Sequence, residues 1–201
     1  MNQLKLINMM EYIHLKDAEL MFFPDFFSFD ESQAFFDHFL NEISLEQGEI
    51  ILFGKRYKTP RLEGLFSDEN LNYSYSGQHL IGNPLTPLLR EIKSKIEEKC
   101  GYIFNCVLVN LYRDGQDSNG WHADNEPELG PDPIIASISL GAVRRFDLKH
   151  NQSGEVFQLY LPAGSLLIMG KGSQIHWKHQ LPKSKKIKTP RVNLTFRYIH
   201  Q

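Results

Sequence analysis

Residues 191–199 read RVNLTFRYI, and polar and apolar side chains alternate along this stretch one by one. Arginine, asparagine and threonine occupy the odd positions up to 197, and branched or aromatic side chains occupy the even positions. A period of two is typical of a β-strand, whose successive side chains point to opposite faces of a sheet. The apolar face predicts contact with a core. The polar face, with an arginine at each end, is consistent with solvent exposure or with a clamp for a carboxylate or phosphate.

The same period recurs upstream, from Gly101 onward. Short β-like runs are separated by turn residues such as Asp114-Gly115, Asn119-Gly120 and Ser153-Gly154. These runs cover residues 103–112, 134–140, 144–148, 156–161, 165–169 and 175–179. Many short strands divided in this way predict a sandwich, a jelly roll or a barrel.

The residues before Gly101 predict helices as well as a strand. A short apolar run at 19–23 precedes Asp30, which predicts a helix N-cap with Gln33 as its capping-box partner. Aromatic and aliphatic residues from 35 to 43 then repeat at intervals of three and four, as on the buried face of a helix.

A second helix is predicted from about Pro84 to Cys100. Either Pro84 or Pro87 suits its first turn, and Gly101 suits its end. The expected fold class is therefore α+β and mainly β, with N-terminal helices bracing one face of the strands.

Composition limits the class of protein. The chain has 201 residues, of which 41% are hydrophobic and 23% charged, so it suits one soluble domain and excludes disorder and collagen-like repeats. Two cysteines are too few for a disulfide framework. No apolar run is long enough for a signal peptide or a membrane span. We expect a monomer without a membrane partner, cytoplasmic if bacterial and nuclear if eukaryotic.

The net charge of −2 conceals an uneven distribution. Residues 1–140 carry 11 basic and 22 acidic side chains, whereas residues 141–201 carry 11 basic and 2 acidic ones. Such asymmetry hints at a polyanionic partner. Basic side chains gather in two short groups, Lys55, Arg56 and Lys58, and Lys183, Lys185 and Lys186.

An apolar segment, Leu52-Phe53-Gly54, directly precedes the first basic group. An apolar wedge beside phosphate-binding cations is one way of holding a nucleic-acid duplex open. The alternative is a buried strand end beside a solvated basic loop, and the second basic group is likewise open to both interpretations.

A candidate metal site lies at Trp121-His122-Ala123-Asp124. On an extended chain His122 and Asp124 point to the same side, so an imidazole and a carboxylate can reach one metal ion. His176 or His179 would supply a third ligand, and their odd separation lets only one of them face the metal from a strand. Two histidines and one carboxylate are the ligand set of non-haem Fe(II) oxygenases. On spacing alone, a polar surface loop is the alternative.

Asn110 and Tyr112 form a second polar pair, on one face of an otherwise apolar run. Buried polar groups need partners. An acidic small molecule inside a barrel would satisfy this pair and the polar face of residues 191–197 together.

These motifs together resemble the AlkB family of Fe(II)- and 2-oxoglutarate-dependent dioxygenases. Asn110-Leu111-Tyr112, His122-Ala123-Asp124, His179 and the R-x-N-x-T-x-R pattern at 191–197 occur in family order and at family-like spacing. The forms at 110–115, 135–142 and 190–197 are most similar to members that repair double-stranded DNA. The resemblance covers roughly residues 53–199. It implies a double-stranded β-helix, a jelly roll, with the dioxygenase domain at 19–201 and residues 1–18 unassigned.

The resemblance also implies roles for individual residues. It gives His122, Asp124 and His179 as the iron ligands. The residues that it implies for 2-oxoglutarate are Asn110, Tyr112, Arg191, Asn193, Thr195 and Arg197. Within this set we expect Arg191 on the distal carboxylate and Arg197 nearer the iron.

For the substrate, the resemblance implies a flipped-out base, because a base inside a duplex cannot reach a buried iron. Arg61, Tyr73, Tyr75 and Glu126 are expected in its pocket, within or near a nucleotide-recognition segment at about 50–80. Without the resemblance, the tyrosines would suit cross-strand packing and Glu126 a solvated loop. The implied activity is O2-dependent demethylation of 1-methyladenine and 3-methylcytosine in duplex and single-stranded DNA, releasing formaldehyde, succinate and CO2. RNA demethylation, or hydroxylation of a protein or small molecule, is the alternative.

Overall fold

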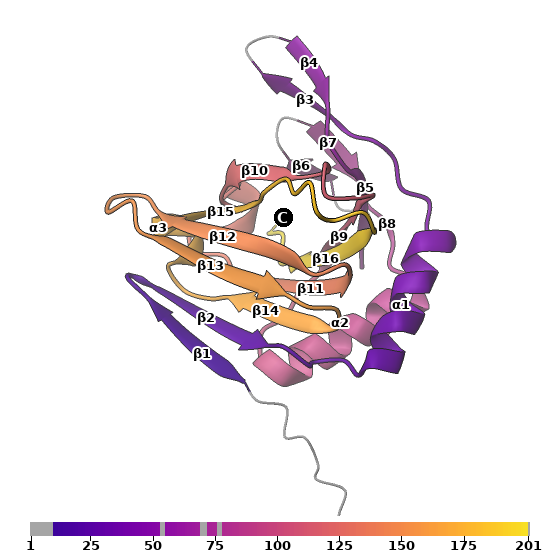
Figure 1. The fold of residues 1–201 in the computed structure, drawn as a ribbon, viewed down its shortest axis with the longest axis horizontal. Coiled ribbons are helices and arrows are strands. Elements are labelled where there is room, and N and C mark those ends of the chain that lie inside the picture. Colours follow the sequence, from indigo (N-terminus) through magenta and orange to yellow (C-terminus); the bar gives the residue numbers. More distant parts are fainter. Residues whose placement is uncertain (1–9, 53–54, 69–71, 76–77, 201) are drawn as a thin grey trace, which may run out of the picture.

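Two β-sheets face each other, and two helices cover the outer side of the larger one (Figure 1). The structure is a computed structural model and describes residues 10–52, 55–68, 72–75 and 78–200. The larger sheet contains, in order across it, β1 (Glu11–Leu15), β2 (Ala18–Phe23), β14 (Ser165–Met169), β11 (Ile135–Gly141), β16 (Arg191–Arg197), β9 (Cys106–Tyr112), β5 (Leu62–Ser67) and β8 (Asn83–Pro84). The smaller sheet contains β10 (Asn119–His122), β15 (Trp177–Leu181), β12 (Arg144–His150) and β13 (Val156–Leu161). This is the mainly β, jelly-roll arrangement that the sequence predicts.

The burial of strand β16 distinguishes between the two interpretations of its polar face, solvent exposure and a clamp for an anion. All of its residues from Arg191 to Arg197 are buried, the polar ones included. Its apolar side chains, such as Leu194, pack against the helices in the larger core cluster. The polar row lines a cavity between the sheets together with residues of the smaller sheet. The solvent-exposed interpretation is therefore wrong.

Helix α1 (Phe29–Asn41) has its N-cap two residues before the predicted one. Its N-cap is Ser28, whose hydroxyl accepts from the Glu31 amide at 3.3 Å, while the Glu31 carboxylate accepts from the Ser28 amide at 3.0 Å. Ser28 and Glu31 satisfy the same capping-box pattern as the predicted pair Asp30 and Gln33. Asp30 instead lies in the first turn, where its negative charge interacts favourably with the positive end of the helix dipole.

This difference is testable. We expect Ser28→Ala to lower the free energy of unfolding by about 1 kcal/mol, because the hydroxyl loses its bonds with the Glu31 backbone amide and the Glu31 carboxylate. Asp30→Ala removes only an exposed charge near the helix terminus, so its cost should be smaller and should fade at high salt. Urea denaturation of both variants at low and high salt measures the two effects. A larger loss of unfolding free energy in the Asp30 variant than in the Ser28 variant would show that Asp30 is the cap.

Helix α2 (Pro87–Cys100) starts later than about Pro84. Its N-cap is Thr86, Pro87 occupies the first turn, and Gly101 ends it in the left-handed conformation with φ of 73°. Residues 83 and 84 are unavailable to the helix because they form β8, which pairs with β5. Both helices pack against the larger sheet and brace it as expected.

A helical turn interrupts the predicted strand at 175–179. Residues Ser173–His176 form the short helix α3, and β15 begins only at Trp177. Gly172 begins this turn with φ of 76°, and its backbone amide donates to Asp132 at 3.0 Å. His176 and His179 therefore do not share a strand, and the odd-spacing argument used to separate them does not apply.

Several boundaries differ from the pattern without changing the fold. The run at 103–112 becomes a strand only from Cys106, and Ile103 lies 68% exposed before it. Part of the unassigned segment 1–18 belongs to the sheet, because β1 pairs with β2. No helix in the described parts of the chain is long and apolar enough to cross a membrane.

Two small hairpins complete the fold. Strands β3 (Glu49–Leu52) and β4 (Lys55–Lys58) form one, and β6 (Asn72–Tyr75) and β7 (Gln78–Ile81) form the other. The β3–β4 hairpin projects from the body of the molecule (Figure 1). A 3-10 turn at Pro127–Leu129 follows β10.

Candidate active site

His122, Asp124 and His179 converge at one end of the cavity between the sheets. His122 ends β10 and pairs directly with His179 on β15, and the two imidazole rings lie 4.2 Å apart between centroids. Asp124 follows β10, and its Oδ1 lies 3.9 Å from His122 Nε2. One ligand atom from each residue lies within 4.8 Å of the other two. The structure thus brings together the three residues that the resemblance implies as iron ligands, and it leaves His176 out.

Electrostatics keep these side chains in the forms that bind metal. Burial would raise the pKa of Asp124, but the charges of Arg197 and both histidines outweigh it, and the pKa falls to about 2. Burial, reinforced by His122, lowers the pKa of His179 to about 3, and burial also lowers the pKa of His122. At neutral pH the carboxylate is therefore ionised and both imidazoles carry free lone pairs.

Two neighbours hold Asp124 in place. Arg197 Nη2 donates to Asp124 Oδ1 at 3.0 Å, and both side chains are almost completely buried. The backbone amide of Asp124 donates to Gln174 Oε1 at 2.9 Å. The last residue of β16 therefore orients the carboxylate, while helix α3 holds the backbone of Asp124.

Arg191 occupies the same cavity at the other end of β16. Its Nη2 donates to Ser139 Oγ at 2.8 Å, and its guanidinium lies over the Tyr112 ring, 5.4 Å from the centroid. Burial lowers the pKa of Arg191 to about 10, which still leaves the side chain charged at neutral pH. Its buried Nε has no hydrogen-bond partner among the described residues. A buried cation with an unused donor favours an anionic ligand beside it.

The remaining residues expected for 2-oxoglutarate are Asn193 and Thr195 on β16 and Asn110 and Tyr112 on β9. Asn193 donates to Ser137 Oγ at 2.9 Å and to the Ile138 carbonyl at 2.7 Å, and it accepts from Thr195 Oγ1 at 3.2 Å. Its amide thus serves to orient its neighbours. Asn110 and Tyr112, on the adjacent strand β9, line the cavity from the side. All six residues expected for 2-oxoglutarate line it together with the metal triad, around about 450 Å³ of space that includes its opening.

The fold and this ligand set match a known family model. Residues 19–197 match the model described as the 2OG-Fe(II) oxygenase superfamily.

The chain belongs to this superfamily.

Curated relatives support this membership. The mouse protein named DNA oxidative demethylase ALKBH2 is 42% identical over 159 residues, which cover 75% of this chain and 66% of that protein. The human protein of the same name is 39% identical over 180 residues, covering 84% and 69%. Human alkB homolog 3, named an alpha-ketoglutarate-dependent dioxygenase, is 36% identical over 193 residues, covering 91% and 67%. The chain thus spans about two thirds of the length of these relatives.

A solved structure shows the same fold. The protein in "The structure of OsALKBH1" is 17% identical, with a TM-score of 0.64, over 92% of this chain and 100% of that chain. The cofactors expected from the sequence, Fe(II), 2-oxoglutarate and O2, are those of this oxygenase superfamily. The residues present fit them, because the triad supplies two nitrogen donors and a carboxylate and the unused Arg191 Nε suits a dicarboxylate.

Arg61 is buried inside the oxygenase, whereas a residue that contacts a base on an open surface would be exposed. Its Nε donates to Asn110 Oδ1 at 2.9 Å, and its Nη1 donates to Asn119 Oδ1 at 3.3 Å. Its Nη2 lies 3.0 Å from Glu63 Oε2, and both charged side chains are buried. Arg61 therefore links two strands: β9, which lines the cavity proposed for 2-oxoglutarate, and β10, which carries His122.

The other residues expected at the base lie farther out or outside the described side chains. Glu126 is half-buried at the start of the 3-10 turn and is not among the residues lining the cavity. Tyr73 and Tyr75 belong to β6, where they pair with Leu80 and Gln78, and their side chains lie outside the described ones.

The two basic groups lie on the surface of the oxygenase. Lys55, Arg56 and Lys58 are exposed along β4. Leu52 ends β3 opposite Lys55, while Phe53 and Gly54 lie outside the described residues. Lys183, Lys185 and Lys186 belong to the loop between β15 and β16, where all three are exposed.

That loop is anchored at Gly115. The Gly115 amide donates to the Ile187 carbonyl at 3.1 Å, and the Ser184 amide donates to the Gly115 carbonyl at 2.7 Å. A Cβ at position 115 would collide with the Ser184 carbonyl oxygen, so the close approach requires glycine.

Sequence reasoning missed three supporting residues. Glu63 follows Arg61 by two positions on extended chain, and this spacing of opposite charges was a usable signal. Gln174 and Arg144 gave none, because their partners are distant in sequence. Arg144 is buried and donates to the carbonyls of Asp114, Asp117 and Pro182, so it joins the loops around the cavity.

Proposed function

We propose that the protein is an oxidative demethylase of N-alkylated DNA bases, acting on 1-methyladenine and 3-methylcytosine in duplex as well as single-stranded DNA. The observation that carries the proposal is the single cavity that holds a two-histidine, one-carboxylate set and a buried row of cationic and polar side chains. The names of the ALKBH2 relatives, which specify DNA oxidative demethylation, support the substrate class.

Each group of residues has a part in this proposal. His122, Asp124 and His179 hold Fe(II), and Arg191 binds the distal carboxylate of 2-oxoglutarate through its unused Nε. Arg197 positions Asp124, and Asn193 positions Thr195. When bound, Fe(II) would activate O2 as the oxidant, and 2-oxoglutarate would supply two electrons as it becomes succinate and CO2. The hydroxylated N-methyl group would then leave as formaldehyde.

The exposure of the triad indicates where the base enters. About 25% of the His122 side chain is exposed, against 1% for Asp124, so the cavity opens on the β10 side. Trp121, next to His122, is 42% exposed on the same strand. A flipped-out base would therefore approach past His122, with Glu126 and the tyrosines of β6 as its proposed recognition groups.

Formaldehyde release tests the activity. Purified protein with Fe(II), ascorbate and 2-oxoglutarate should release formaldehyde from DNA containing 1-methyladenine, and release should stop when iron is chelated. Matched duplex DNA, single-stranded DNA and RNA separate the proposal from RNA demethylation. Intact iron and 2-oxoglutarate binding without release from any methylated DNA would exclude it and favour a protein or small-molecule substrate.

The β3–β4 hairpin carries the proposal for duplex DNA. Its exposed cations Lys55, Arg56 and Lys58 suit phosphates, and Phe53, which lies outside the described residues, is the proposed wedge. We expect Phe53→Ala to slow demethylation of duplex DNA more than that of single-stranded DNA. Removing the three cations should weaken duplex binding. It should also make the slope of log affinity against log salt concentration shallower by about 1 for each phosphate that is no longer neutralised.

The matched control replaces three exposed lysines far from the hairpin, Lys149, Lys171 and Lys178, by alanine. This variant should keep the parent's salt dependence and its preference between duplex and single strand. Equal losses on both strand forms in the Phe53 variant would remove the wedge from the proposal.

A further inference from the structure

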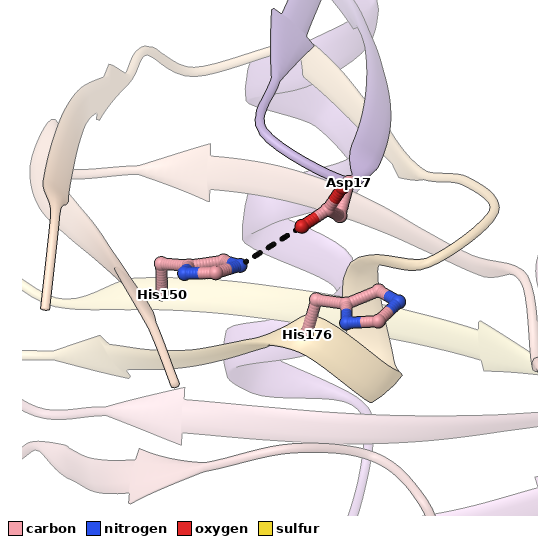
Figure 2. A group of neighbouring side chains, drawn as sticks. All are labelled: Asp17, His150 and His176. Atoms are coloured by element: carbon pink, nitrogen blue, oxygen red, sulfur yellow. Dashed lines mark ion pairs between the residues drawn. The ribbon is translucent and has the colours of Figure 1, made fainter. Parts of the chain in front are cut away.

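A second group of metal-ligating side chains lies away from the cavity. Asp17 sits in the turn between β1 and β2, His150 ends β12, and His176 ends α3. Figure 2 shows Asp17 and His150 pointing toward each other, with His176 beside them. One ligand atom from each residue lies within 4.8 Å of the other two. Three separate elements thus contribute two imidazoles and a carboxylate to one small volume.

Backbone contacts fix the three elements against one another. Trp177 Nε1 donates to the Lys16 carbonyl at 2.8 Å, which joins the β1–β2 turn to the start of β15. The Asn151 amide donates to the His176 carbonyl at 2.8 Å, which joins the end of β12 to α3. Asp17 itself adopts a φ of 58°, an uncommon backbone conformation for a residue other than glycine. These bonds hold the ligand-bearing positions together without using the proposed ligand side chains.

His150 gives the independent indication of a ligand. The residue is 1% exposed, and its Nε2 has no hydrogen-bond partner among the described residues. Asp17 Oδ2 lies 3.5 Å from this nitrogen, which is too far for a good hydrogen bond. A buried nitrogen without a partner is costly, and a metal ion between it and the carboxylate would satisfy both groups.

The other nitrogen of His150, Nδ1, accepts from the Ser153 backbone amide at 3.0 Å, and this bond fixes the ring. Metal-bound histidines donate a hydrogen bond from the nitrogen that does not bind the metal, and this bond fixes the ring. His150 Nδ1 lies 2.9 Å from Ser153 Oγ, a hydroxyl that can accept this bond. Without a metal the ring proton therefore resides on Nε2 and faces Asp17. A metal on Nε2 would displace this proton to Nδ1, where the Ser153 hydroxyl would accept it in place of the amide contact.

We propose that Asp17, His150 and His176 bind a Zn²⁺ ion. Nitrogen and carboxylate donors suit zinc, whereas Ca²⁺ and Mg²⁺ prefer sites made wholly of oxygen. Zinc also binds a given nitrogen and oxygen site more tightly than Fe²⁺ does. Asp17 is exposed, so water can complete the tetrahedron.

Such an ion would tie the β1–β2 turn and the end of β12 to α3. Helix α3 also carries Gln174, whose Oε1 accepts from the backbone amide of the iron ligand Asp124. The zinc site and the iron centre would therefore share one short helix, while their ligand sets stay separate.

Zinc titration of a protein with a disabled iron triad tests the proposal. In a His122→Ala background, calorimetric titration with ZnCl2 should saturate at one equivalent, and zinc should raise the Tm. Addition of Asp17→Asn or of His176→Ala should abolish both the heat and the Tm shift. These two positions are exposed and half-buried, so the variants should fold, and circular dichroism checks this.

The control adds His14→Ala to the same background. His14 is exposed on β1 and stacks on Tyr12, with a ring separation of 6.2 Å, so its loss removes a nearby histidine but no proposed ligand. This variant should bind zinc like the background. Absence of zinc binding in the background protein, or full binding in folded Asp17 and His176 variants, would overturn the proposal.

Discussion

The His122→Ala variant should lose oxidative activity by more than about 100-fold. Replacing even a hydrogen-bond partner of a metal ligand costs about 10–100-fold in affinity or activity, and His122 is itself a proposed ligand. His122 ends β10 and its side chain is about 25% exposed, so its removal leaves no large buried cavity. We therefore expect an unchanged Tm, strongly weakened Fe(II) binding and no measurable formaldehyde release.

His14→Ala is the matched control, since it makes the same substitution on an exposed histidine far from the cavity. It should retain iron binding and turnover. Asp124→Ala would be a less clear test, because it would also leave Arg197 buried without its carboxylate. Iron binding at the parental level in the His122 variant would contradict the assignment of the triad.

The second large effect is expected for Arg191→Met, which should raise the KM for 2-oxoglutarate. Truncating one partner of a buried, hydrogen-bonded charge pair costs about 2–5 kcal/mol, or on the order of 30-fold to several-thousand-fold. Stability should stay the same or increase, because an apolar side chain of similar size replaces a buried cation. Initial rates against 2-oxoglutarate and against methylated DNA, together with Tm, separate the two effects.

Arg90→Met serves as the control, since Arg90 lies exposed on α2, on the outer side of the larger sheet. Its KM for 2-oxoglutarate should equal the parental value. The Arg191 variant should change the KM for DNA little. An unchanged KM for 2-oxoglutarate in a folded Arg191 variant would show that the dicarboxylate binds elsewhere.

The sequence predicts strands in both sheets because strand formation here follows local alternation. The runs at 156–161 and 165–169 coincide with β13 and β14. The burial of the polar face of β16 is less accessible from the sequence. Alternation assigns residues to two faces, but only the second sheet, opposite Arg191 and Thr195, determines that neither face meets water.

Other features depend on contacts between distant residues. Ile175 to His179 alternates like a strand, yet the bonds of Gly172 and Ser173 turn its first half into helix α3. That turn carries His176 to the side of Asp17 and His150, which no spacing rule relates to it. Similarly, the buried contact of Arg61 with Asn110 appears only when β5 and β9 are placed side by side.

The ion pair between Arg197 and Asp124 has a consequence for folding in the absence of iron. Proteins whose metal ligands have no other partners depend on the metal for folding, as zinc fingers do. Here the carboxylate already has a cationic partner at 3.0 Å, and its two histidine neighbours are neutral at physiological pH. We therefore expect the chain to fold without iron, so that loss of the metal removes activity and leaves the fold intact.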